Sequence, residues 1–207
     1  MYIPSSFAET DLPTLHDFIE RHSFGLLVSQ VAAVPFVTHV PMLLNRTAGD
    51  YGTITTHIAR ANPQWREIAG QTVLAVFAGP HAHITPAWYD TNRAVPTWNY
   101  TAVHAYGHVV VIEQPDELWN IVQRAVATYE GGRPKPWSTA GDESFARGLL
   151  PQIVGLRLKI TRLEGKFKLS QNHPAERREK VIASLEQQGD ENSLGVAELM
   201  RRSLAVE

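Results

Sequence analysis

Closely spaced β-rich segments occupy most of residues 24–112 and leave little room for long connections between strands. Residues 24–31, 34–44 and 51–57 are rich in Val, Ile, Leu, Thr and Phe, and residues 45–50 are typical of a turn. Parallel strands need crossover connections of a dozen or more residues, whereas antiparallel strands can follow one another through short turns. The spacing therefore predicts an antiparallel sheet.

Helical patterns lie mainly at the two ends of the chain and after the first strands. Further strands are expected over 72–79, 95–113 and 152–169. Apolar residues recur at helical spacing over 11–21, 115–130 and 174–187. Short helices are also expected over 142–150 and 194–202, and one or two helical turns within 58–70. This order predicts an α+β fold with a closed or nearly closed antiparallel barrel of six or so strands. We expect a barrel domain over 1–170 and a C-terminal helical extension over 171–207.

The composition excludes several kinds of chemistry. The 207 residues include no cysteine, which excludes disulfides, thiolate nucleophiles and cysteine-ligated metals. Nine histidines are present, but no spacing typical of a metal site or of a catalytic triad occurs, so no metal and no catalytic residues are predicted. The formal net charge of −2 argues against a protein that coats nucleic acid. The N-terminus resembles no signal peptide and no segment suits a membrane span, so a cytoplasmic location is expected.

Three short segments carry residue types that suit ligand binding. The first has a strand running into a helix start and fits either a phosphate site or an ordinary capped turn. The second has two aromatics and an amide at a strand start, and fits either a flat ligand or a core layer. The third alternates cations and a hydroxyl on one face, and fits either an anion or a solvated strand. These candidate residues are Thr56, His57, Arg60 and Asn62; Thr97, Trp98, Asn99 and Tyr100; and Lys166, Lys168, Ser170 and Gln171.

A basic segment lies between residues 157 and 180. It contains eight Lys or Arg and three Glu, a local net charge of +5. Such a segment could meet a phosphate group or a nucleic-acid backbone, or it could be a strand and a helix with solvated charges.

Together these segments resemble the PaiB-type family of FMN-binding negative transcriptional regulators. The matching runs follow one another from residue 1 to about 185: MYIPSSF, THVPMLL, THIARANPQW, VFAGPHAHITPAWY, VPTWNYTAVHAYG and IVGLRLKITRLEGKFKLSQN. His83 stands where Tyr is common in the family, Thr85 where Ser is common, and His173 where Arg is common.

The resemblance implies an FMN-binding split β-barrel, usually a homodimer with flavin sites near its interface. It also implies roles for the three candidate groups. The first group, with Arg60, would cradle the FMN phosphate. The second would flank the isoalloxazine ring, and the lysines of the third would face the phosphate or the polar edge of the flavin.

Three functions are compatible with the sequence. The resemblance favours a flavin-binding repressor whose contact with DNA, direct or through a partner, would use the basic segment 157–180. A flavin-dependent oxidoreductase using FMN and a nicotinamide or other electron donor is the alternative, with His57 or His83 as proton donor. A flavin- or haem-binding module without turnover is the third. Fold alone cannot choose among them.

Overall fold

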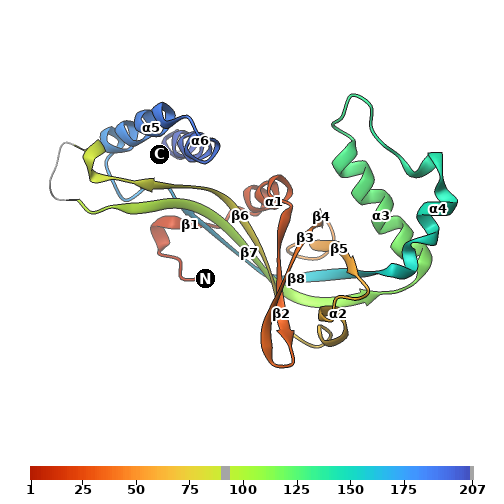
Figure 1. The fold of residues 1–207 in the computed structure, drawn as a ribbon. Coiled ribbons are helices and arrows are strands. Elements are labelled where there is room, and N and C mark those ends of the chain that lie inside the picture. Colours follow the sequence, from red (N-terminus) through yellow and green to blue (C-terminus); the bar gives the residue numbers. More distant parts are fainter. Residues whose placement is uncertain (90–93, 206–207) are drawn as a thin grey trace. The chain divides into compact units, whose positions relative to one another are not determined.

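The computed structural model describes residues 1–89 and 94–205. Six α-helices and eight strands form an α+β fold (Figure 1), as the sequence predicts. The strands are β1 (Ala8–Glu9), β2 (Phe24–Val31), β3 (Val34–Pro41), β4 (Leu43–Asn45), β5 (Thr53–Ala59), β6 (Val73–Ile84), β7 (Thr97–Ile112) and β8 (Ile153–Lys168). The helices are α1 (Leu12–Arg21), α2 (Gln64–Glu67), α3 (Pro115–Glu130), α4 (Glu143–Gly148), α5 (Ala175–Gln188) and α6 (Glu191–Leu204).

The sheet is antiparallel and open. Its strand order is β3-β2-β6-β7-β8-β5-β4, with β1 paired to β8. The pairs β1–β8, β2–β3, β2–β6, β4–β5 and β5–β8 all run antiparallel. Within the described residues the ladder ends at β3 and at β4, so backbone pairing does not close the barrel that the sequence suggests. The strand count exceeds six because the segment expected as one strand over 34–44 breaks after Pro41, and the two-residue β1 has no sequence pattern.

The chain divides into two compact units. Unit 1 contains Met1–Phe18, Ala78–His104 and Glu164–Glu207, and unit 2 contains Ile19–Phe77 and Ala105–Leu163. Strands β6, β7 and β8 each run through both. The boundary expected from the sequence, between residues 170 and 171, stays a prediction.

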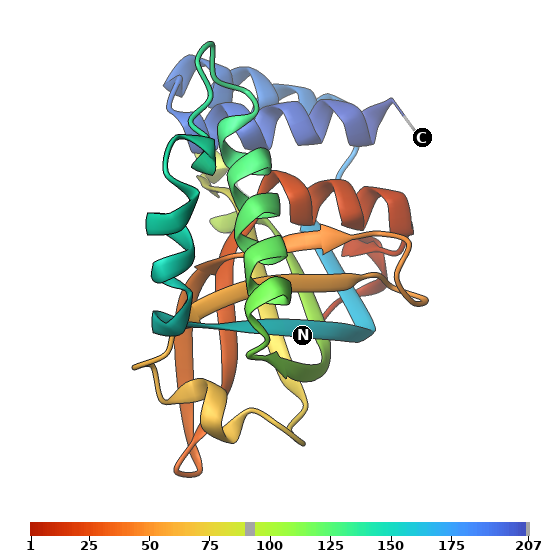
Figure 2. The same cartoon turned by 90° about the vertical axis from the view of Figure 1, so that its right-hand side faces the viewer.

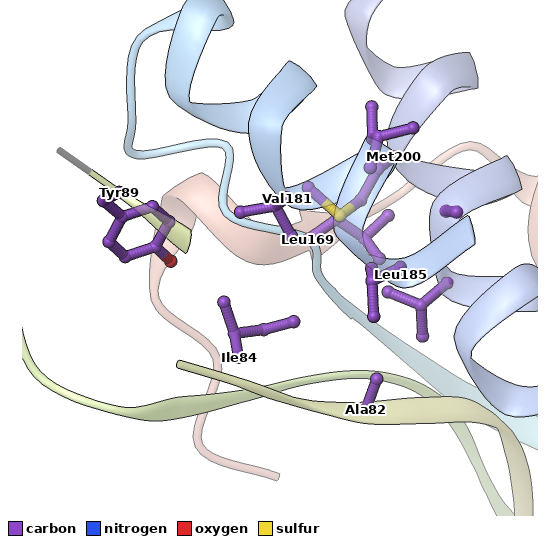
Figure 3. Close-up of a cluster of buried hydrophobic side chains, with 10 residues drawn as sticks. Ala82, Ile84, Tyr89, Leu169, Val181, Leu185 and Met200 are labelled. Atoms are coloured by element: carbon purple, nitrogen blue, oxygen red, sulfur yellow. The ribbon is translucent and has the colours of Figure 1, made fainter. Parts of the chain in front are cut away.

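Unit 1 has an apolar core beneath its two C-terminal helices. Figure 3 shows Val181, Leu185 and Met200 pointing from α5 and α6 toward Ala82 and Ile84 of β6. Two local signals fix this helix pair. Gly189 ends α5 with a positive φ of 73°, and the carboxylate of Asp190 accepts a hydrogen bond from the Ser193 amide at the start of α6. A left-handed glycine and an acidic N-cap are common helix boundaries.

In unit 2, α3 lies across strands of the sheet (Figure 2). Proline at the first helical position and two acidic residues in the first turn favour its start at Pro115. Leu118, Trp119 and Ile121 form its buried side and pack with Ile112 and Leu150. In the described part of the chain, no helix is both long and apolar enough to cross a bilayer.

Candidate functional site

Four predicted site residues lie at the end of β5 in unit 2. Thr56 is buried, and its hydroxyl donates to the Pro41 carbonyl at 2.6 Å. His57 is half-buried, and burial holds the pKa of its imidazole below the usual value. A neutral imidazole offers one N–H donor and one acceptor nitrogen, whichever tautomer it adopts.

Each nitrogen of the Arg60 guanidinium makes a polar contact with the chain. Nε donates to the Pro151 carbonyl at 2.8 Å, and Nη2 donates to the Ile153 carbonyl at 3.1 Å. Nη1 pairs with Oε2 of Glu113 at 2.6 Å, which supplies a counter-ion. The role of Arg60 as a phosphate ligand stays a prediction, and these contacts show that the residue also ties β5 to β8 and to residue 113.

Asn62 belongs to a buried polar network that sequence reasoning missed. Its Oδ1 accepts from the Gln64 amide at 2.9 Å, and its Nδ2 donates to Oγ1 of Thr38 at 2.9 Å. The Thr38 hydroxyl also donates to Oε1 of Gln64 at 2.6 Å. Gln64 is fully buried and reaches Oγ of Ser29 at 2.9 Å. The Asn-Pro-Gln run is the signal for this turn, but nothing in the sequence indicates that Gln64 points inward.

The other eight predicted residues lie in unit 1, around the end of β8. Lys166 is only 7% exposed. Its Nζ donates to the Tyr2 carbonyl at 3.0 Å and lies 5.4 Å from the Tyr2 ring centroid and 5.2 Å from that of Tyr100. Among the described residues no carboxylate lies within ion-pair distance of this ammonium. A buried cation without a counter-ion is costly, which makes an anionic ligand favourable here.

Lys168 occupies the same face of β8, two residues further on. Its Nζ donates to the Thr97 hydroxyl at 2.5 Å and to the Trp98 carbonyl at 2.6 Å. Burial, and then the positive charge of Lys166, lower the pKa of this ammonium. Two neighbouring cations that repel each other form an electropositive centre in unit 1.

Asn99 and Ser170 form a buried polar pair. Asn99 has no exposed surface, and its Nδ2 donates to the Ser170 hydroxyl at 3.0 Å. Ser170 has a positive φ of 65° in the turn after β8. Gln171 stabilises that turn, because its amide donates to the Phe167 carbonyl at 2.6 Å and accepts from the Leu169 amide at 2.7 Å. In this structure these three side chains shape the turn rather than point to solvent.

Trp98 is 54% exposed, which is unusual for so large an apolar side chain. His83 meets its ring edge-on with centroids 5.5 Å apart, and His81 lies at 6.1 Å. The two histidines and the tryptophan make an exposed aromatic surface in unit 1. No group of three His, Asp or Glu that could hold a metal ion occurs in the part of the chain that the structure describes.

The basic segment 157–180 does not form one exposed cationic face. Arg178 is fully buried and donates to the Ser203 hydroxyl at 2.6 Å. Arg157 pairs with Glu117 at 2.9 Å, and Lys180 pairs with Glu176 at 3.3 Å. Its local charge of +5 is therefore distributed over interior and surface contacts in both units.

FMN carries a phosphate and a flat aromatic ring, and the residues of unit 1 fit both. Lys166 and Lys168 supply cations that pair with no carboxylate among the described residues. The Tyr100 ring lies 5.2 Å from the Lys166 ammonium, and Trp98 of the same unit supplies an exposed ring. These residue types bind phosphate groups and stack on flat rings.

Comparison with known proteins gives a family. A family model described as "Putative FMN-binding domain" matches residues 1–162. The chain is 37% identical over 207 residues to the Bacillus subtilis protein named "Protease synthase and sporulation protein PAI 2", covering 99% of this chain and 98% of the relative.

Two solved structures share the fold at low sequence identity. The FAD and heme binding protein from Mycobacterium smegmatis aligns with a TM-score of 0.61 and 16% identity, over 85% of this chain and 79% of that one. The flavocytochrome Anf3 from Azotobacter vinelandii aligns with a TM-score of 0.58 and 15% identity, over 78% and 69%. These likenesses confirm the fold class. The family model and the full-length relative together show that this chain belongs to the PaiB-type family of FMN-binding proteins, with FMN as its cofactor.

Proposed function

We propose that this protein is a cytoplasmic, homodimeric FMN-binding regulator of gene expression, and that Lys166 and Lys168 contact the flavin. The observation that carries the site is the buried Lys166 ammonium, which has aromatic neighbours and, in the described residues, no carboxylate partner. An anionic group beside this lysine would compensate its charge in a region of low dielectric constant. The phosphate offers such oxygens, and the N1–O2 edge of the ring gains negative charge when the flavin is reduced.

The regulatory part of the proposal is supported by the relative whose name refers to protease synthesis and sporulation. That relative matches 99% of this chain, and 98% of its own length is covered. A gel-shift titration with the promoter region of the protein's own operon, at several salt concentrations, tests direct DNA contact. A salt-dependent shift supports it, since phosphate contacts release counter-ions. Size-exclusion chromatography with light scattering measures the molar mass in solution and so tests the homodimer.

The flavin site is tested by replacing one lysine. We expect Lys166→Met to weaken FMN binding by about tenfold or more, because it removes a charge-assisted contact while filling the same volume. The measurement is a titration of FMN followed by quenching of its fluorescence. Lys159→Met is the matched control, since Lys159 is exposed on the same strand.

A second variant distinguishes the candidate group around Arg60 from the group around Lys166 and Lys168. If Arg60 cradles the phosphate, Arg60→Ala weakens FMN binding by an order of magnitude. If the flavin is held by the lysines alone, Arg60→Ala affects stability through its contacts to Glu113 and the backbone and leaves FMN affinity intact. Wild-type affinity in both Lys166→Met and Arg60→Ala would contradict the predicted site.

Oxidoreductase activity is the second candidate, favoured by His81 and His83 against the exposed Trp98 ring. When bound, FMN supplies electron transfer, and an imidazole beside it could hold or deliver a proton. Oxidation of NADH or NADPH by the FMN-loaded protein, faster than with free FMN, would support it. Unchanged turnover in a His83→Gln variant would show that His83 is not the proton donor.

A further inference from the structure

A pocket with a mainly apolar lining and several polar side chains lies within unit 2, between α3 and the sheet. Its volume is about 270 Å³, and none of its residues belongs to the candidate flavin site. Strands β4, β5 and β8 and their connections contribute Asn45, Ala48, Thr53, Thr55 and Arg157, and α3 contributes Glu117, Asn120, Ile121 and Arg124.

The strand register explains why these polar groups gather on one face. Asn45 is the cross-strand partner of Thr53, and Thr55 is the partner of Arg157. Because Thr53 and Thr55 are two residues apart, all four side chains lie on the same face of the sheet. On the helix, residues 117, 120, 121 and 124 form a single stripe at helical spacing. Figure 2 shows α3 running across these strands.

One of the two arginines that line this pocket has no ion-pair partner among the described residues. Arg157 is paired with Glu117 at 2.9 Å. Arg124 has no carboxylate within ion-pair distance among the residues that the structure describes. The pocket therefore carries two arginines against one glutamate, a net charge of +1.

Hydrogen-bonding groups are available beside this cation. Thr55 is only 4% exposed, yet its hydroxyl makes no hydrogen bond to the described residues, unlike that of Thr53, which donates to the Ala48 carbonyl at 2.8 Å. Thr55 lines the pocket, so the hydrogen-bonding capacity of its hydroxyl is open to a ligand. Asn120 adds an amide from the helix, and Ile121 adds an apolar wall.

From this arrangement we propose that the pocket binds a small metabolite bearing one oxyanion group, a carboxylate or a phosphate. Arg124 binds the anionic group, and the Thr55 hydroxyl and the Asn120 amide bind further polar atoms. The volume of about 270 Å³ lies just below the range of about 300–1,000 Å³ that is usual for small-molecule sites, so the ligand is small.

Titrations of the isotope-labelled full-length protein with sodium phosphate, sodium acetate and neutral glycerol, at constant ionic strength, test this inference by NMR. Saturable shifts at the amides of α3 and β5 with either anion support it, and the anion that binds identifies the phosphate or the carboxylate class. Absence of saturable shifts with both anions, or equal shifts with glycerol, would overturn it.

Two variants locate the contacts. Arg124→Gln should weaken anion binding by about tenfold or more, and Thr55→Val, which keeps the side-chain shape, should weaken it severalfold. Lys135→Gln is the charge-matched control, because Lys135 is an exposed residue of the same unit that does not line the pocket. Unchanged anion affinity in Arg124→Gln would overturn the proposal.

Measuring FMN affinity in the same variant shows whether this pocket is distinct from the flavin site. The Arg124→Gln variant should retain wild-type FMN affinity, and loss of FMN binding in it would overturn the claim of a second site. If wild-type protein binds phosphate or acetate at α3 but takes up no FMN, only the proposed flavin function fails.

Discussion

At the scale of single residues, His57 makes the free energy of unfolding depend on pH. Burial lowers the pKa of its imidazole from the ordinary value of 6.5. Above that pH the imidazole is neutral whether the chain is folded or unfolded. Below it, the unfolded chain binds a proton that the folded chain resists, so the free energy of unfolding decreases as the pH falls. His22, His104 and His173 are shifted in the same direction, chiefly by burial.

We therefore expect stability to decrease between about pH 7.5 and about pH 5.5, and to decrease less in His57→Gln. The glutamine keeps a polar side chain but cannot take up a proton. Urea unfolding at the two pH values, followed by tryptophan fluorescence, gives the change in the free energy of unfolding for each protein. The three other histidines keep part of the pH dependence in the variant. An identical decrease in wild type and variant would show that His57 does not contribute.

At the scale of elements, the β2–β3 hairpin contains an unusual turn. Val31 pairs with Val34, and the two residues between them, Ala32 and Ala33, have positive φ angles of 51° and 59°. Two-residue hairpins with both φ values positive normally use Asn-Gly, because an L-residue with a Cβ is strained there. This hairpin therefore forms despite its turn residues, because its strands pair along their full length.

Replacing Ala33 by glycine should stabilise the protein by about 0.5–1 kcal/mol, since relief of left-handed strain exceeds the added freedom of the unfolded chain. The measurement is thermal and urea unfolding. Ala127→Gly, in the exposed part of α3, is the matched control. It should destabilise by about 1 kcal/mol, because glycine is unfavourable inside a helix. Destabilisation by both changes would mean that the turn is unstrained.

The sequence predicts the long elements well and the turns poorly. Leu118 and Ile121 recur at helical spacing, and α3 spans the expected 115–130. The alternation in residues 153–168 likewise predicts β8 and places Lys166 and Lys168 on one face. The Ala-Ala turn has no turn signal, and β6 continues through Pro80, which is a breaker in most strands. The contact between Lys166 and Tyr2 joins residues 164 positions apart, a separation that local patterns do not reach.

At the scale of the whole molecule, helices α5 and α6 supply part of the core of unit 1. Val181, Leu185, Val196 and Met200 come from these helices and are almost completely buried against Ala82 and its neighbours (Figure 3). Burial of apolar surface contributes roughly 25 cal/mol per Å², so these side chains supply a large share of the stability of the unit.

A chain ending at residue 170 should therefore lose the tertiary structure of unit 1. Ala82, Ile84 and Leu169 would be exposed to water, and we expect strong binding of a hydrophobic dye and loss of near-ultraviolet circular dichroism. Leu185→Ala in the full chain gives a milder test, with an expected loss of about 2–5 kcal/mol, whereas the exposed Gln187→Ala should change little. A truncated chain with native dichroism would show that 171–207 is a separable extension.

The interleaving of the two units along the chain limits how this fold can be recombined. Unit 1 consists of three segments, Met1–Phe18, Ala78–His104 and Glu164–Glu207, and the two segments of unit 2 lie between them. A single genetic crossover between homologues at residues 85–163 joins the end of β6, on which α5 and α6 pack, from one parent to α5 and α6 from the other. The α5–α6 layer would then have to pack on strands with which it had not coevolved. Diversification of this fold is therefore expected to proceed by point substitution rather than by exchange of whole units.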